Sequence, residues 1–185
     1  MTAPRILIVE DNAIVAYNLQ DKLLEMGYEP CGVLFSGEDA VVRLPELQPD
    51  LVLMDIRLPG EIDGVEAAAR IRAQYDVPVV YVTGHSDEAT LQRAKCTEPF
   101  GYLLKPFDDR EVMSAIEMAL YKHRMEHLLR ESERRYRFLS ELTSDYAYAV
   151  HVDEDGRMLL DWASEAFLRF TGLEVGRSYS VDEWS

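Results

Sequence analysis

Residues 51–64, LVLMDIRLPGEIDG, form the stretch that decides which fold this sequence predicts. The first four residues are a short, entirely apolar run, which is typical of a strand that is covered on both faces. Asp55 ends this run and is followed directly by IRLPG, so a charged side chain stands where the strand stops. The pattern predicts a buried parallel strand with an acid at its carboxyl end.

Strand and helix signals alternate on both sides of this stretch. The other strand-like runs are RILIV at 5–9, YEPCGVLF at 28–35, PVVYVT at 78–83 and GYLLK at 101–105. Helical spacing of apolar residues follows at 12–26, after a capping Ser36, at 63–75, at 87–95 and from Asp108 onwards. Gly27 is expected to end the first helix. A strand–helix unit repeated five times predicts an α/β fold, a doubly wound five-stranded parallel sheet.

Reactive or charged residues end most of the expected strands. They are Glu10 and Asp11, Asp55, Thr83 and Lys105. Because the carboxyl ends of parallel strands share one crevice, we expect these side chains to converge. Each has an ordinary explanation by itself, since an Asp after a strand often caps the next helix. Their joint occurrence, each at its own strand end, favours a functional site.

The chemistry of this set points to phosphoryl transfer. Three neighbouring carboxylates repel one another and raise a carboxyl pKa unless a cation compensates. A hard divalent ion, most naturally Mg²⁺, would bind them and keep positions open for water and a phosphoryl group. Lys105 adds a positive charge, and the Thr83 hydroxyl can donate a hydrogen bond. Asp55 is then an ionised carboxylate nucleophile, which is a route to an acyl phosphate.

Residues 4–122 resemble the receiver domain of two-component response regulators. The matching residues are Glu10–Asp11, Asp55 in LVLMDIRLPGEIDG, Thr83 in VVYVTG, and Tyr102 with Lys105–Pro106 in FGYLLKPF. The resemblance implies a flavodoxin-like sheet with strand order 2-1-3-4-5. It also implies that Asp55 is phosphorylated from a phosphohistidine of a sensor histidine kinase or a phosphotransfer protein.

The same resemblance implies a ligand set and a switch. Mg²⁺ would be held by Glu10, Asp11, Asp55 and the backbone carbonyl of Arg57. Thr83 and Tyr102 would form the switch, with the hydroxyl moving toward the phosphoryl group and the ring turning inward. A cis bond between Lys105 and Pro106 fits the family, and only X-Pro bonds make it inexpensive. Two departures are mild, because Glu10 replaces a more common Asp and Gly84 a more common Ala, and neither removes a chemical role.

Residues 108–143 contain neither Pro nor Gly, so the last helix of the repeat is expected to run on past the first domain. A flawed coiled-coil seam with alternating spacings of three and four follows Lys122, Met125, Leu129, Ser132, Tyr136, Leu139 and Thr143. The seam predicts a homodimer through this helix, and the alternative is an amphipathic helix packed back on its own domain. His123 and His127 are interpreted as solvated helix positions.

The pattern changes again after residue 145. YAYAVHVDEDGRMLLDW predicts a β-hairpin, and SEAFLRFTG predicts a short capped helix ended by Gly172. With the preceding RESERRYRFLSELTSD, the segment resembles the signalling-helix entry and N-terminal half of a PAS sensor domain, an α+β fold. We therefore divide the chain into a receiver domain at 1–122, a helical linker at 123–145 and a partial PAS domain at 146–185.

The net charge of −15 argues against non-specific nucleic-acid binding, which depends on cationic contacts with phosphates. No apolar run reaches the roughly 20 residues of a bilayer span. Cys31 and Cys96 stand in unrelated contexts, and no signal peptide precedes the first strand, so a reduced cytoplasmic protein is expected.

The sequence thus predicts a phosphorylation-controlled signalling module that is not itself an enzyme, although a longer parent could carry a histidine kinase. The module would relay its switch through the long helix to a PAS or other output region. One alternative is a phosphate-independent dimerisation scaffold, which the intact Asp55, Thr83 and Lys105 argue against. Another is an Asp-nucleophile phosphatase of the haloacid dehalogenase type, but those enzymes have DxD after their first strand.

Overall fold

A computed structural model of the chain describes residues 3–84, 93–94, 97, 99–142, 146–153 and 157–180, and side chains of the long helix up to residue 137. The chain forms two compact units, Met1–Glu126 and His127–Ser185.

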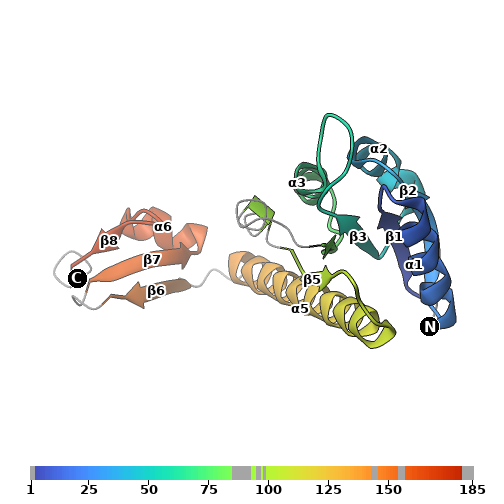
Figure 1. The fold of residues 1–185 in the computed structure, drawn as a ribbon. Coiled ribbons are helices and arrows are strands. Elements are labelled where there is room, and N and C mark those ends of the chain that lie inside the picture. Colours follow the sequence, from blue (N-terminus) through green and yellow to red (C-terminus); the bar gives the residue numbers. More distant parts are fainter. Residues whose placement is uncertain are drawn as a thin grey trace. The chain divides into compact units, whose positions relative to one another are not determined.

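The first unit is built on a five-stranded parallel sheet with the order β2-β1-β3-β4-β5 (Figure 1). Its strands are β1 Arg5–Val9, β2 Glu29–Leu34, β3 Leu51–Asp55, β4 Val79–Thr83 and β5 Gly101–Leu104. The predicted α/β sheet and its strand order are therefore confirmed.

Helices cover both faces of this sheet, and each face has its own apolar core. Because successive side chains of a strand point to opposite faces, β1 sends Leu7 and Val9 to one core and Ile6 and Ile8 to the other. The first core also contains Ala40, Leu44, Val65, Ala68 and Ile71 from α2 (Gly37–Leu47) and α3 (Gly64–Gln74). The second contains Ala16, Leu19, Leu23, Val112, Ile116 and Ala119 from α1 (Ala13–Glu25) and α5 (Asp109–Leu142). All five residues of β3 are buried, as the apolar run predicted.

Two predicted helix ends are confirmed. Ser36 caps α2, because its hydroxyl accepts a hydrogen bond of 3.2 Å from the backbone N–H of Asp39. Gly27 follows α1 with a φ of 86°, a left-handed conformation that favours glycine and stops the helix.

The long helix is continuous, since α5 runs from Asp109 to Leu142 without interruption. The helix predicted at 87–95 lies outside the described residues except for Arg93 and Ala94, which are helical. Among the residues that the structure describes, none of the helices has the length and apolar character needed to cross a membrane.

The second unit contains an antiparallel sheet with the order β6-β7-β8 and one short helix. Its elements are β6 Tyr148–Val152, β7 Met158–Ala163, α6 Glu165–Thr171 and β8 Ser178–Tyr179. The pairing of β6 with β7 confirms the predicted hairpin, although its turn at 154–156 lies outside the described residues. Ser164 caps α6 and Gly172 ends it in a left-handed conformation, as predicted. Leu160, Ala163, Phe167 and Tyr179 form a small core.

Candidate functional site

The carboxyl ends of four strands meet at one cavity of the first unit, with a volume of about 400 Å³. Glu10 and Asp11 directly follow β1, Asp55 ends β3, Thr83 ends β4 and Lys105 directly follows β5. All five line the cavity, together with Asn12, Val15, Arg57 and Gly84. The convergence that the strand ends predicted is thus present.

Lys105 lies between two of the acids. Its Nζ donates a hydrogen bond to Oδ2 of Asp55 at 2.5 Å and another to Oε2 of Glu10. Both carboxylates are almost fully buried, with residue exposures of 7% for Asp55 and 2% for Glu10. A buried carboxylate needs a charged or hydrogen-bonding partner, and Lys105 provides one cation for the two acids.

Burial and charge shift the pKa of two of these groups. Loss of solvent raises the pKa of Glu10, and the neighbouring Asp55 adds to that, whereas the hydrogen bond from Lys105 opposes it. Burial disfavours the charged form of Lys105, but its hydrogen bonds to Asp55 and Glu10 outweigh that effect and raise its pKa. The site therefore favours the charged form of Lys105 and disfavours the charged form of Glu10.

The three acids also fit a metal ion. Ligand oxygens of Glu10, Asp11 and Asp55 lie within 4.8 Å of one another, and the Asp11 side chain is exposed while the other two are buried. Oxygen-only donors with net negative charge suit a hard divalent cation such as Mg²⁺. The backbone of Arg57 is next to them, because its N–H donates to Oδ1 of Asp55 at 2.8 Å.

The loop after Asp55 returns so closely that only glycine fits at its end. A Cβ at Gly64 would lie 1.8 Å from the backbone carbonyl oxygen of Asp55. The N–H of Gly64 donates to the carbonyl of Ile56 at 3.1 Å, and Asp63 caps α3 through the N–H of Glu66. Sequence reasoning missed this role of Gly64, and the DG pair before a helical segment was the available signal.

The two predicted switch residues lie on neighbouring strands, Thr83 at the carboxyl end of β4 and Tyr102 within β5. Thr83 is buried, and its hydroxyl donates to the carbonyl of Gly84 at 2.8 Å. Tyr102 lies on β5 and is 38% exposed as a residue, and its ring centroid is 5.8 Å from that of Tyr81. The peptide bond between Lys105 and Pro106 is cis, as the resemblance implied.

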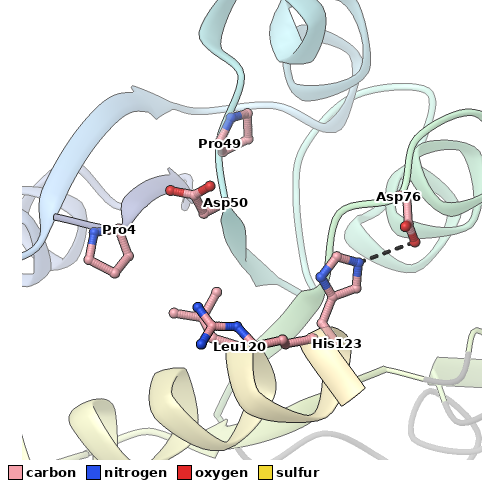
Figure 2. Close-up of a pocket in the computed structure, with 7 residues that line it drawn as sticks. Pro4, Pro49, Asp50, Asp76, Leu120 and His123 are labelled. Carbon is pink, nitrogen blue, oxygen red and sulfur yellow. Dashed lines mark ion pairs between the residues drawn. The ribbon is translucent and has the colours of Figure 1, made fainter. Parts of the chain in front are cut away.

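A second cavity of about 460 Å³ lies at the opposite, amino end of the strands (Figure 2). Its lining residues are Pro4, Pro49, Asp50, Asp76, Leu120, His123 and Arg124. Nε2 of His123 lies 3.2 Å from Oδ1 of Asp76, and the imidazole makes an edge contact with Phe100 at a centroid distance of 5.5 Å. The interpretation of His123 as a solvated position is therefore wrong, because α5 turns that side chain toward the sheet. His127 is exposed, as expected.

The first unit of the chain is similar to one protein family. The family model described as "Response regulator receiver domain" matches residues 6–117. A curated relative, the "Transcriptional regulatory protein PdtaR" of Mycobacterium tuberculosis, is 39% identical over 121 residues. The match includes 65% of this chain and 58% of that protein, so the chain spans little more than half the length of the relative.

Solved structures agree with this assignment. The signal receiver domain of a modulated diguanylate cyclase from Desulfovibrio desulfuricans is 44% identical, with a TM-score of 0.65. That match covers 67% of this chain and 98% of the other. The N-terminal domain of a response regulator/sensory box/GGDEF three-domain protein from Carboxydothermus hydrogenoformans is 32% identical, with a TM-score of 0.61 and coverages of 66% and 98%.

Proposed function

The chain belongs to the response regulator receiver domain family, and from that premise we propose that Asp55 accepts a phosphoryl group from a sensor histidine kinase or a phosphotransfer protein. The observation that carries the proposal is the position of Asp55 in the cavity, buried and bonded to the ammonium group of Lys105. An ionised carboxylate that is held in place beside a cation is prepared both to attack a phosphorus atom and to tolerate the charge that follows.

The proposed step exchanges one bond to phosphorus for another. The P–N bond of a donor phosphoimidazole breaks, and a P–O bond forms to a carboxylate oxygen of Asp55. The leaving imidazole nitrogen keeps the electron pair and takes up a proton. Lys105 is placed to contact a phosphoryl oxygen, since its Nζ already contacts the accepting carboxylate. Positioning and charge neutralisation supply most of the catalysis of such a transfer.

We propose that Glu10, Asp11, Asp55 and the backbone carbonyl of Arg57 hold Mg²⁺ in this site. The spacing of the three carboxylates and the contact of Arg57 with Asp55 support this ligand set. When bound, the ion neutralises charge that develops on the phosphoryl oxygens. The residues of the chain hold the accepting carboxylate in place and shield it from water.

Thr83 and Tyr102 are the proposed switch. In the structure the Thr83 hydroxyl faces the carbonyl of Gly84, so a rotation of its side chain is required before it can donate to a phosphoryl oxygen on Asp55. The exposed ring of Tyr102 would then turn inward, toward the space that the Thr83 side chain leaves. Phosphorylation biases such a two-state equilibrium only to the extent that the phosphoryl group contacts one state better.

The output is proposed to run through α5 to the second unit. Met125, Leu129 and Tyr136 of the predicted seam are exposed in the single chain, which favours pairing of α5 in a homodimer. The hairpin and capped helix of the second unit support a partial PAS domain. The Carboxydothermus hydrogenoformans relative, whose receiver is followed by a sensory box, supports the same order of domains.

Incubation with acetyl phosphate and Mg²⁺ tests the proposal. We expect intact-protein mass spectrometry to detect one added phosphoryl group, and Asp55→Asn to abolish it. Sedimentation with and without beryllofluoride tests the scaffold alternative, and an assay of phosphoester hydrolysis tests the phosphatase alternative. A dimer that ignores both reagents supports the phosphate-independent scaffold, and rapid turnover of small phosphoesters supports the haloacid dehalogenase-type phosphatase.

A further inference from the structure

Glu38 lies in the first turn of α2 and binds the loop that follows Asp55. It does not line the cavity that contains Glu10, Asp11 and Asp55. Its Oε1 accepts hydrogen bonds from the backbone N–H of Glu61 at 2.6 Å and of Ile62 at 3.0 Å. Both donors belong to residues 56–63, the loop between β3 and α3. Hydrogen bonds from backbone N–H groups to a carboxylate are charge-assisted and therefore stronger than neutral ones.

The pKa of Glu38 agrees with this role. Hydrogen bonds from its own backbone N–H and from those of Ile62 and Glu61 hold the pKa below its ordinary value. The carboxylate is thus ionised at neutral pH, where it is the better acceptor. Its helix is fixed to the core by Ala40 and Leu44, so the acceptor stands on a rigid element.

The loop is shaped around this carboxylate. Gly60 has a φ of +123°, and a Cβ there would lie 2.5 Å from Oε1 of Glu38. On the other side, a Cβ at Gly37 would lie 3.1 Å from the backbone carbonyl oxygen of Ile62. Glycine at both positions lets the loop backbone and the start of α2 approach each other closely.

The loop that carries Arg57 is also held at its other end, next to Asp55. At the near end of the loop, the N–H of Arg57 is bonded to Oδ1 of Asp55, and Gly64 closes the loop onto Ile56. At the far end, Glu38 holds Glu61 and Ile62. We expect the direction of the Arg57 carbonyl to depend on both ends, because both lie in one loop and Pro59 within it has a fixed φ.

We propose that Glu38 is a positioning residue for the metal site, which it serves by fixing the loop so that the Arg57 carbonyl can act as a ligand. The inference rests on the proposed function, in which Glu10, Asp11 and Asp55 bind Mg²⁺. Glu38 itself does not touch the ion or the phosphoryl group. Partners of this kind, which hold a ligand without binding the metal, typically contribute tenfold or more to metal affinity.

Mg²⁺ titration by calorimetry of Glu38→Ala, Glu38→Gln and the parent chain tests this. We expect Glu38→Ala to weaken Mg²⁺ binding by roughly tenfold. Phosphorylation by acetyl phosphate should approach the parent rate once Mg²⁺ is saturating, because the reacting groups are unchanged. Glu38→Gln should recover part of the affinity, since an amide carbonyl oxygen can still accept both hydrogen bonds. Asp39→Asn is the matched control, because Asp39 is the next acid on the same helix turn and is exposed.

Gly60→Ala changes the same loop and provides a second test if Glu38→Ala does not fold. Gly60→Ala should displace the Glu38 carboxylate, weaken Mg²⁺ binding in a similar way, and add little when combined with Glu38→Ala. Amide hydrogen exchange of Glu61 and Ile62 in the metal-free protein should be faster in both variants. Unchanged Mg²⁺ affinity in Glu38→Ala or in Gly60→Ala, with the parent binding Mg²⁺, would overturn the proposal. If the parent binds Mg²⁺ but never accepts a phosphoryl group, the proposed function fails while the role of Glu38 is still decided by affinity.

Discussion

The two ends of the five-stranded sheet each carry an acid–base contact, and the two contacts differ in how far water reaches them. At the carboxyl end, the side chains of Glu10 and Asp55 are 3% and 10% exposed, and Lys105 is 24% exposed. At the amino end, His123 is 19% exposed but its partner Asp76 is 50% exposed (Figure 2). The two paired carboxylates are therefore buried at one end, whereas the carboxylate that pairs with His123 at the other end is half exposed.

This difference predicts different consequences for the two contacts. Removal of one partner from a buried pair leaves an uncompensated charge, which is strongly destabilising. A pair with a solvated member loses little, because water replaces the lost partner. The carboxyl end therefore depends on Lys105 to compensate two buried carboxylates. At the amino end, the contacts of His123 with Asp76 and Phe100 hold α5 against the rest of the unit.

Gly64→Ala is expected to have the largest effect on stability, because Gly64 lies against the backbone of Asp55 at the carboxyl end of the sheet. The new Cβ would overlap the carbonyl oxygen of Asp55, at 1.8 Å in the present backbone. The loop and α3 must shift apart, so we expect the free energy of unfolding to fall by about 3 kcal/mol or more. Urea unfolding of the chain followed by circular dichroism measures this.

Gly84→Ala is the matched control for that substitution. Gly84 lines the same cavity, but an added Cβ meets no atom within 4 Å and the residue does not need a left-handed conformation. We expect a change of about 0.5 kcal/mol or less. Equal losses in both variants would contradict the idea that the return of the loop onto Asp55 is what makes this end so tight.

Lys105→Met should have the second largest effect. It leaves Glu10 and Asp55 buried together without their cation, so we expect a loss of about 2–3 kcal/mol in the free energy of unfolding in the presence of EDTA. Millimolar Mg²⁺ should restore part of the loss, because the ion replaces the missing charge. Urea titrations with and without Mg²⁺ measure both values.

Lys122→Met controls for the removal of a lysine that also pairs with a glutamate. Lys122 lies 3.9 Å from Glu126 and over the ring of Phe100, but its side chain is 55% exposed. We expect its substitution to change stability by about 0.5 kcal/mol or less, with no dependence on Mg²⁺. A Lys105 variant that behaves like the Lys122 variant would remove the distinction between the two ends.

His123→Gln tests the amino end directly. The contact with Asp76 is half solvated, so we expect a loss of at most about 1 kcal/mol in the free energy of unfolding. Mg²⁺ affinity and the rate of phosphorylation by acetyl phosphate should be unchanged, because the residue lies at the far end of the strands. A large loss of either activity would mean that the two ends communicate through the sheet or α5.

The sequence predicted the carboxyl end better than the amino end, for a physical reason. Residues such as Asp55, Thr83 and Lys105 stand where apolar runs stop, and parallel strands bring their carboxyl ends to one edge. A local pattern therefore carried three-dimensional information. The meeting of these residues followed from it, whereas the order of the strands came from the resemblance to receiver domains.

Contacts that depend on how a loop returns could not be predicted in this way. Gly64 contacts the Asp55 backbone because the loop after β3 folds back on itself. Glu38 binds the N–H groups of Glu61 and Ile62 because α2 packs beside α3 and the loop before it. No periodicity marks those positions. His123 was misread for a related reason, because helical spacing does not tell which face meets Phe100 and Asp76.

Leu129→Lys is expected to have the smallest effect on the stability of the first unit. It tests whether α5 forms a dimer beyond that unit. Leu129 is an exposed residue of the predicted seam, and a charge there should dissociate a dimer paired through that seam. Leu128→Lys is the matched control, because Leu128 is also exposed but lies outside the seam. Sedimentation of the two variants should show a monomer for Leu129→Lys and the parent state for Leu128→Lys.

Both variants should keep the stability of the first unit within about 0.5 kcal/mol, since neither residue belongs to its cores. Identical sedimentation of the two variants would reject the seam, whereas a monomer that still accepts a phosphoryl group on Asp55 would show that the carboxyl end works within a single chain.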